Sequence, residues 1–564
     1  MLLLTALAWC GSAALASSIP PSASVRRLPP PPVVDLGYAR YQGFFNDTTE
    51  LYEWRGIRFA TAARFQAPRT PKKTVAVQNA TEYGPTCWQG TVGLKGTLGT
   101  LPHISTPGEQ SEDCLFVNIQ APPRALKGGK LPVLVWIHGG GYGIGDSSTT
   151  SDLSEFLRLS GSNFVIVRTS YRLGPFGFLA GEAVKKHGVL NAGLLDQQFA
   201  LQWVQQHVLK FGGDPGHVAV WGVSAGAGSI LNHLIANGGD TISALGLKKP
   251  LFQAAITSSV FLPPQVEYNA PSVEKAYKRL ASAVNCTGAA SSFDCLAKVD
   301  AAKLAAAAFA NAAAAPWAVW TYVPVIDGSF LRDRASVLLK QGRARLNGKF
   351  LTAINNADEG AIWADPTLAA DSTTDSTALA SQFDRLLAGL FPQLNASERQ
   401  VVAEYYPFSR APSIGNTVAR ISAVIADSTF NCPSYWLAEA FGSSAHKGTF
   451  AISPASHGWD TFYYLGDIFG GNRSRSSVES FDGALAGAIL GSFDPNNNPA
   501  NSHLNPYWPT FDTRREMVFN TTTTDLSSPA DPRIVKTSSL KRFGKDQLER
   551  CEFWRGPISK NAGL

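Results

Sequence analysis

The chain lacks the features that would place it across a membrane or on a nucleic acid. No apolar run of 18 or more residues follows the N-terminal segment of this 564-residue sequence, which argues against a membrane-spanning helix. Lys and Arg are scattered and the net charge is only +6, so the basic stripe that nucleic-acid binding requires is missing. There is also no C-x-x-C pair, which argues against a metal site built from cysteines. We expect neither a metal nor a cofactor. Since 45% of the residues are apolar, a sizeable core can be buried instead.

The N-terminal segment has the composition of a secretory leader followed by a linker. An apolar run over residues 2–9 precedes the small-residue site Ala14-Leu15-Ala16, so we expect a signal peptide over residues 1–16. Residues 17–34 are rich in Pro and Ser and are expected to form an extended linker. Residues 35–564 are then interpreted as one catalytic domain without repeats or further linkers.

Cysteine and asparagine usage agrees with a secretory location. Loss of residues 1–16 removes Cys10 from the seven cysteines and leaves an even set of six. The C-terminal residues 560–564 contain neither a retrieval signal nor a hydrophobic anchor tail. We therefore expect an extracellular, oxidising environment. Six tripeptides fit the N-glycosylation pattern, at Asn46, Asn79, Asn285, Asn395, Asn472 and Asn520.

Strands and helices alternate in the middle of the chain. Near-continuous apolar runs over residues 131–137 and 164–167 predict strands that are buried on both faces. Residues 193–211 have apolar positions at helical spacing, stop at a breaker cluster over 212–215 and lead into a strand over 217–221. This order predicts an α/β fold with a mostly parallel central sheet flanked by helices. Two later helical stretches are interpreted as insertions around the sheet, residues 299–315 and 368–405.

One serine stands at a strand-to-helix junction. The segment Gly222-Val223-Ser224-Ala225-Gly226 fits G-x-S-x-G directly after the strand over 217–221, and a helix is expected over 225–237. In such a nucleophile elbow a sharp turn exposes the serine, and the flanking glycines let backbones pass closely. The alternative is a glycine-rich turn with an ordinary serine. The surrounding strand and helix favour Ser224 as a nucleophile, which then needs a base and electrostatic help.

A second glycine-rich segment, residues 138–143, follows the strand over 131–137. The N–H groups of Gly140 and Gly141, together with that of Ala225, are predicted to form an oxyanion hole, which is worth about 3–4 kcal/mol per donor in comparable sites. The alternatives are a flexible turn and a phosphate-binding loop. A P-loop would end in G-K-S/T, whereas this segment continues to Tyr142.

In combination, these motifs resemble the type-B carboxylesterase/lipase family, which includes cholinesterases and secreted fungal lipases and has the α/β-hydrolase fold. The resemblance covers most of the chain after the linker. It implies a serine esterase that hydrolyses carboxylic esters through an acyl-enzyme, with a small-molecule or lipid ester as its partner. The further matching segments are residues 52–60, 111–119, 171–179 and 191–226.

The resemblance also implies an acid and a base. The family's acid lies in an E-G pair after a late strand, which is Glu359 here, with the adjacent Asp358 as the alternative carboxylate. The base follows the acid in the chain order of this fold. Of the three histidines that do so, His457 matches the family's His-Gly-x-Asp pattern and follows a strand expected over 449–452. The other two are His446, placed before that strand, and His503, in an Asn/Pro-rich loop. The predicted triad is Ser224, Glu359 and His457.

Structural pairs follow from the same resemblance. Six cysteines allow fifteen pairing schemes, and the family pattern selects one of them. Glu112 and Arg172 match a buried ion pair of the family, with a structural role. The implied disulfides are Cys87–Cys114, Cys286–Cys295 and Cys432–Cys551.

Departures from the family pattern narrow the substrate. Val223 stands where cholinesterases carry a glutamate, and Trp88 is a thin cage for a choline cation, so a neutral ester is expected. In the loop after Trp88, glycines interrupt three leucines that have helical spacing. Each glycine costs about 1 kcal/mol of helix stability. This favours a mobile rim over the helical flap of a lipase. We therefore expect a carboxylesterase. The alternatives are a lipase acting on long-chain acylglycerols, a dedicated secondary-metabolite or aromatic esterase, and a non-catalytic adhesion relative, which the retained triad argues against.

Overall fold

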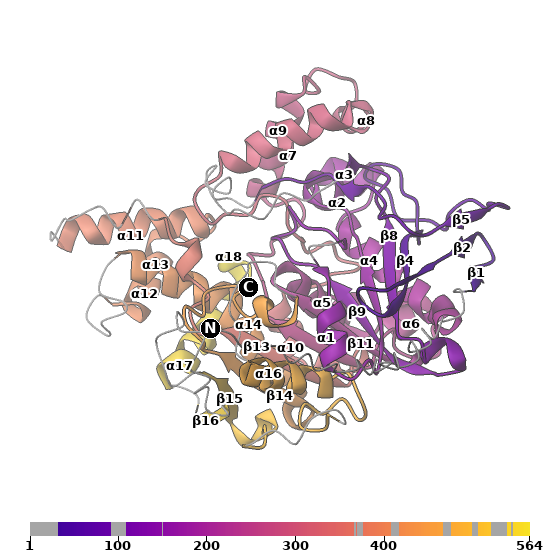
Figure 1. Ribbon diagram of the computed structural model, residues 1–564. Helices are drawn as coiled ribbons and strands as arrows, with labels where there is room; N and C mark the ends of the chain where they lie inside the picture. The colour runs from indigo at the N-terminus through magenta and orange to yellow at the C-terminus, as the bar shows by residue number, and fades with distance from the viewer. Residues whose placement is uncertain are drawn as a thin grey trace, which may run out of the picture.

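An eleven-stranded sheet forms the centre of the computed structural model (Figure 1). The structure describes residues 32–91, 109–148, 151–365, 368, 376–407, 417–465, 475–498, 506–520, 538–542 and 545–564. The predicted signal peptide, most of the predicted linker, Asn472, His503 and the leucines of the predicted rim lie outside these residues. In spatial order the strands are β16 (Ser538–Arg542), β15 (Arg515–Phe519), β14 (Ala445–Phe450), β13 (Phe350–Asn356), β12 (Ala254–Ser258), β11 (Gly213–Val223), β9 (Leu131–Ile137), β10 (Val165–Thr169), β8 (Phe116–Ala121), β4 (Leu51–Arg58) and β3 (Phe44–Asn46).

The middle of the sheet is parallel and its two margins are antiparallel. All neighbouring pairs from β15 to β10 run parallel. The margins are antiparallel where β16 joins β15 and where β8, β4 and β3 follow β10. Parallel strands require crossover connections, and here helices supply them. The predicted α/β fold with a mostly parallel sheet is confirmed.

Apolar clusters cover both faces of the sheet. Along β9, Val133, Val135 and Ile137 belong to one cluster, whereas Leu134 and Trp136 belong to the other. This alternation follows from the two-residue period of a strand. A strand with both faces covered is mostly apolar, which is why the sequence of β9 is a continuous apolar run.

The helices that flank the sheet include α4 (Ala192–His207), α5 (Ala225–Ile235) and α14 (Cys432–Phe441) on one face, and α1 (Ser154–Leu159) and α16 (Arg475–Gly487) on the other. The helix predicted over 193–211 is α4 followed by a 3-10 turn, Val208–Phe211. The predicted breaker at 212–215 differs from expectation, because β11 already begins at Gly213. The register of β11 against β9 shifts between Gly213 and Val218, so the Gly/Pro cluster forms an irregular start of the strand.

Two helical insertions surround the sheet. The first follows β12 and contains α7 (Pro271–Ala283), α8 (Ser292–Lys298) and α9 (Ala301–Ala313), which project as an arm at the top of Figure 1. The second follows β13 and contains α11 (Ser376–Leu390), α12 (Ala396–Tyr405) and α13 (Thr417–Ile425), grouped at the left of that view. No helix among the described residues is long and apolar enough to cross a membrane.

Three disulfides cross-link the described residues, and they pair the cysteines as the family resemblance implies. Cys286–Cys295 ties α7 to α8, and Cys432–Cys551 ties α14 to α17 (Lys545–Trp554) across 119 residues. The third bridge, Cys87–Cys114, closes the loop that follows Trp88.

The predicted ion pair between Glu112 and Arg172 is wrong. Arg172 binds Asp196 of α4 through two hydrogen bonds of 2.7 Å, and both side chains are buried. Glu112 pairs instead with Arg64 at 2.5 Å and is 31% exposed. The chain turns after β10, which places Arg172 beside the first turns of α4. The buried Asp196 lies in these turns.

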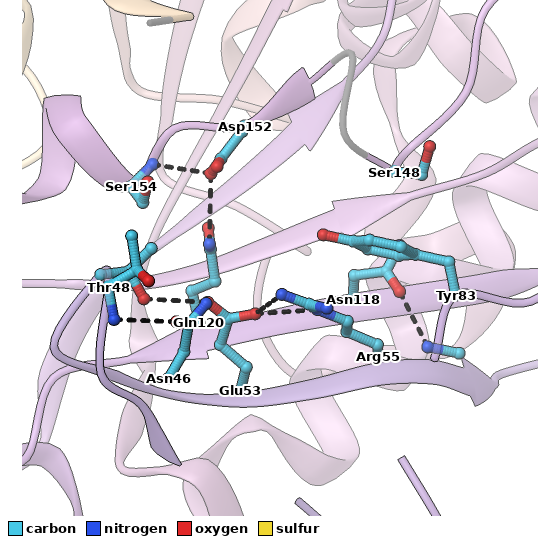
Figure 2. A network of polar contacts seen from close by, with 12 residues as sticks. Asn46, Thr48, Glu53, Arg55, Tyr83, Asn118, Gln120, Ser148, Asp152 and Ser154 are labelled. Atoms are coloured by element: carbon cyan, nitrogen blue, oxygen red, sulfur yellow. Dashed lines mark hydrogen bonds and ion pairs between the residues drawn. The ribbon is translucent and has the colours of Figure 1, made fainter. Parts of the chain in front are cut away.

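A buried carboxylate organises the sheet margin at β3 and β4 (Figure 2). Glu53 is only 1% exposed, a position at which an uncompensated charge would be strongly destabilising. Arg55 donates to its Oε2 from Nε at 2.9 Å, while Asn46 Nδ2 and Thr49 Oγ1 donate to Oε1 at 2.9 and 3.0 Å. The side chain of Asn46, a predicted glycosylation site, is therefore part of an interior network.

The end of the predicted linker is part of a strand. Val33 and Val34 belong to β1 (Val33–Asp35), which pairs with β2 (Arg40–Gln42). The predicted linker therefore overlaps this strand at Val33 and Val34, because Pro-rich composition does not mark where strand pairing begins.

Candidate active site

Ser224 occupies the turn between β11 and α5. Its backbone angles are φ 55° and ψ −122°, a strained conformation for a residue with a side chain. The turn holds because the Ser224 N–H donates to Ser258 O at 2.9 Å and its own carbonyl accepts from Gly228 N at 2.8 Å. A Cβ at Gly226 would lie 2.0 Å from Ile137 O, so the backbones pass too closely there for any side chain. These are the features of a nucleophile elbow.

A chain of two hydrogen bonds joins the serine to a buried carboxylate. His457 Nε2 lies 2.9 Å from Ser224 Oγ, and His457 Nδ1 lies 2.6 Å from Glu359 Oε2. A carboxylate only accepts, so the Nδ1 proton points at Glu359 and leaves Nε2 with a lone pair toward the serine hydroxyl. This tautomer is the one able to take a proton from Ser224.

Glu359 is fixed from its other side as well. The side chain is fully buried, and its Oε1 accepts from the backbone N–H of Asn356 at 2.7 Å and from Asn355 Nδ2 at 3.5 Å. The neighbouring Asp358 is exposed, and partial burial together with the charge of Glu359 raises the pKa of its carboxyl. Of the two adjacent carboxylates, the structure brings only Glu359 to the histidine.

The histidine loop follows β14, which begins earlier than expected. The strand predicted over 449–452 is Ala445–Phe450, so His446 lies within it rather than before it. His446 is buried and contacts Trp508 O at 3.2 Å, and the neighbouring Lys447 is buried beside Glu516 at 3.8 Å. These buried polar residues hid the first half of the strand from an apolar-run analysis.

Asp460 connects the histidine loop to the acid loop, a role that the sequence did not reveal. It is fully buried, and burial raises the pKa of its carboxyl. Its Oδ1 accepts from Asn356 Nδ2 at 2.9 Å, and its Oδ2 accepts from Tyr464 at 2.9 Å. Asn356 in turn donates its backbone N–H to Glu359, so Asp460 holds the residue that orients the acid.

Aromatic rings from the insertions enclose the histidine. Phe430 packs on the His457 ring with centroids 4.4 Å apart, and Trp363 does so at 5.2 Å. Trp363 contacts Trp320 at 5.1 Å, and Trp320 contacts Phe261 at 4.6 Å. Phe430 lies in a π-helical turn, Ala426–Asn431, a feature that often occurs at functional sites. No local motif marks these residues in the sequence.

The predicted oxyanion loop passes directly over the serine. A Cβ at Gly139 would lie 2.7 Å from Val223 O and 3.2 Å from Ser224 Cβ. Gly140 and Gly141 have φ angles of 105° and 59°, and the Gly140 carbonyl accepts from Gly143 N and Ile144 N at 3.0 Å each. The loop is therefore held in one conformation.

Ala225, the third predicted oxyanion donor, is the first residue of α5. The first N–H groups of a helix have no partner within the helix. The N-terminal end of the helix also carries partial positive charge. Its N–H is thus placed to meet an anion beside the serine.

The surroundings of the serine are apolar rather than anionic. Val223 is 9% exposed and contributes no charge. The Trp88 ring stacks on Phe176 with centroids 6.4 Å apart. Among the described residues at the site, the acids Glu359 and Asp460 are buried and hydrogen-bonded.

Comparison with known proteins gives consistent results. Residues 30–542 match the carboxylesterase family. A carboxylesterase of Aspergillus clavatus, patB, is 28% identical over 93% of this chain and 96% of its own length. Lipase 4 of Diutina rugosa is 31% identical over 68% of this chain and 73% of its own, and a secreted lipase of Arthroderma benhamiae is 28% identical over 76% and 75%. The crystal structure of Aspergillus niger EstA superposes with a TM-score of 0.77 at 27% identity, over 94% of this chain and 99% of that one.

Proposed function

This chain belongs to the carboxylesterase family, which makes it a carboxylic ester hydrolase, and we propose that it is a secreted enzyme that cleaves neutral esters with a Ser224–His457–Glu359 triad. The observation that carries the proposal is the hydrogen-bond chain of 2.9 and 2.6 Å from the serine hydroxyl to a fully buried carboxylate. Two separate insertions and more than 200 residues of chain intervene between its members, so sequence proximity does not account for it.

In the first half of the reaction, Ser224 Oγ attacks the ester carbonyl carbon as His457 Nε2 takes the hydroxyl proton. The carbonyl oxygen becomes an oxyanion, for which the N–H groups of Gly140, Gly141 and Ala225 are the proposed donors. The tetrahedral intermediate collapses when the bond to the alcohol oxygen breaks and His457 returns the proton to that oxygen. The alcohol leaves, and the acyl group remains on Ser224.

In the second half, water replaces the alcohol. His457 takes a proton from the water as its oxygen attacks the acyl carbon, and a second tetrahedral intermediate forms at the same donors. The bond to Ser224 Oγ then breaks, and His457 returns the proton to the serine. The carboxylic acid ionises and departs. Throughout, Glu359 holds the imidazole orientation and stabilises its cationic form.

The preference for neutral esters rests on what surrounds the serine. Val223 provides no carboxylate next to the nucleophile, and the rings of Trp320, Trp363 and Phe430 offer an apolar surface. The Trp88 ring stacks on Phe176. Trp88 would therefore have to bind a choline cation as a single ring, which makes a weak cation site. Ester chains without charge match this lining better than choline esters.

Secretion is supported by the three disulfides and by relatives that are named as secreted lipases. Disulfides form and persist in oxidising compartments. Under this proposal residues 1–16 are removed, residues 35–564 form the catalytic domain, and the exposed sequons at Asn79, Asn285, Asn395 and Asn520 are open to glycosylation. The Asn46 amide, which would carry a glycan, donates instead to buried Glu53, and Asn472 lies outside the described residues.

A second candidate is lipase activity on long-chain acylglycerols, since several relatives are named as lipases. Hydrolysis of p-nitrophenyl esters with short, medium and long acyl chains would separate the two, combined with the rate on emulsions above the solubility limit. A short-chain optimum without interfacial activation indicates an esterase, and a rise in rate at the interface indicates a lipase.

The triad itself is tested by Ser224→Ala. We expect a fall in kcat on the order of 10⁴ or more, because no other nucleophile remains to form the acyl-enzyme. A Ser243→Ala variant serves as the matched control, because it makes the same chemical change at an exposed serine of α6 (Thr241–Leu245) that forms no hydrogen bond with the triad. Undiminished esterase activity in Ser224→Ala would overturn the mechanism.

A further inference from the structure

A large chamber is lined in part by Trp320, one of the aromatic residues described at the active site. It has a volume of about 830 Å³, within the range of small-molecule sites, about 300–1,000 Å³. It is enclosed by both insertions, from α7 and the segment after α9 on one side and from the end of α11 and α13 on the other. Its lining is mainly apolar and includes Phe178, Val266, Val319, Trp320, Phe391 and Ile425.

Trp320 belongs both to the lining of this chamber and to the aromatic cluster at the active site. Trp320 lines the chamber and also a small cavity of about 10 Å³ at Gly141, in the proposed oxyanion loop. It packs on Phe261, whose N–H donates to Ser224 O at 3.3 Å. Trp320 therefore connects the lining of the chamber, through Phe261, to the backbone of the serine.

Two positively charged side chains lie where the chamber meets the solvent. Lys275 and Arg279 of α7 both line it, and both are exposed. They are four residues apart on the helix and so lie on the same face. Figure 1 shows α7 and α9 side by side in the projecting arm.

No acid among the described residues offsets these cations within the chamber. None of the residues that line it is Asp or Glu. Glu274, which precedes Lys275 in α7, accepts a hydrogen bond from the Glu182 N–H at 2.7 Å and so is bound to α3 (Glu182–His187). In the described part of the chain neither cation forms an ion pair. An apolar chamber with an uncompensated cationic edge is complementary to an amphiphile that carries one negative charge.

Ester hydrolysis itself produces such a molecule. The substrate is neutral, whereas the acid released from it is an anion with an apolar tail. We propose that the chamber binds this carboxylate product, with the tail among the apolar side chains beyond Trp320 and the carboxylate at Lys275 and Arg279. This inference rests on the ester hydrolysis of the proposed function, and does not depend on which residues form the triad.

Paired ligands test the proposal. Dodecanoate and methyl dodecanoate have the same tail and differ in charge, so we expect only the first to use the two cations. Binding is measured by calorimetry below the micelle concentration on the full chain carrying Ser224→Ala, which keeps the methyl ester intact. Release of dodecanoate from the methyl ester by this variant would count against Ser224 as the nucleophile. The proposal for the chamber would then be tested by the binding of dodecanoate alone.

A Lys275→Glu/Arg279→Glu variant in that background is expected to weaken dodecanoate binding about tenfold, because two exposed attractions become repulsions. Methyl dodecanoate binding should change less than twofold. Lys278→Glu is the matched control, since Lys278 is exposed on the same helix and does not line the chamber. The proposal is overturned if dodecanoate binds equally well to the double variant, if the methyl ester loses as much affinity, or if Lys278→Glu has the same effect.

Discussion

The substitution Glu359→Gln should be as damaging as removal of the whole side chain. The reason lies in what surrounds its two oxygens. Oε1 accepts from the Asn356 N–H at 2.7 Å, and Oε2 accepts from His457 Nδ1 at 2.6 Å. A glutamine has only one oxygen to offer. Its NH₂ group facing the Asn356 N–H would oppose two donors in a buried site, which costs about 1–3 kcal/mol.

The glutamine oxygen will therefore face Asn356, and its NH₂ group will face His457. An NH₂ group donates, so Nδ1 must accept and the imidazole proton moves to Nε2. Nε2 can then no longer accept a proton from Ser224. The geometry survives, but the tautomer is wrong. In the equivalent substitution of a serine protease this lowers kcat about 10⁴-fold, which corresponds to about 5.4 kcal/mol. We expect a loss on the order of 10³–10⁴ here.

The assay is kcat for p-nitrophenyl butyrate, with the unfolding midpoint in urea as a check on folding. Asp358→Asn is the matched control, because it makes the same chemical change in the adjacent residue, whose side chain is exposed and does not contact His457. It should retain activity within about threefold of wild type. The reasoning is refuted if Glu359→Gln keeps more than a tenth of the wild-type kcat, or if Asp358→Asn loses as much.

Three further predictions concern the loop, the bridge and the pH dependence of folding. Gly139→Ala should lower kcat at least about 100-fold, because its Cβ would lie 2.7 Å from Val223 O and 3.2 Å from Ser224 Cβ, so the loop or the elbow must shift; normal kinetics would show that the loop can move aside. Replacing Cys432 and Cys551 by serine should lower the free energy of unfolding by about 2–5 kcal/mol, read from urea denaturation, and an unchanged midpoint would contradict this. Burial lowers the pKa of His233 from 6.5 to about 3, so the folded state binds fewer protons than the unfolded one, and this contribution to stability, complete above pH 6.5, is lost as the pH falls toward 3. His233→Gln should therefore make unfolding free energy less steep between pH 6.5 and 4, and an identical slope in both proteins would refute it.

Much of the central sheet was predictable because its strands are covered on both faces. The strand predicted over 131–137 is β9, residue for residue, since each of its positions from Val133 onward contacts apolar side chains. The first half of β14 was missed for the opposite reason, because His446 and Lys447 are buried with polar partners. A polar residue that is paired inside the protein looks like a surface residue in the sequence.

The residues of the candidate site also fall into two groups, those that a local motif predicts and those that it does not. The elbow around Ser224 and the loop around His457 are local motifs, and the structure brings them together with Glu359 in hydrogen-bonding geometry. The aromatic rings near the histidine, such as Phe430, come from insertions whose placement depends on long-range packing. The false pair of Glu112 and Arg172 arose similarly, because local patterns cannot choose among partners that meet only in the folded chain.

The wide spacing of the hydrogen-bonded residues makes esterase activity a measure of the intact fold. Ser224 and His457 are 233 residues apart, and His457 is 98 residues from Glu359. No proteolytic fragment shorter than that span contains the whole chemistry. Loss of activity during heating or limited proteolysis would therefore mark the point at which the ends of β11, β13 and β14 separate. This holds wherever in the chain the damage begins.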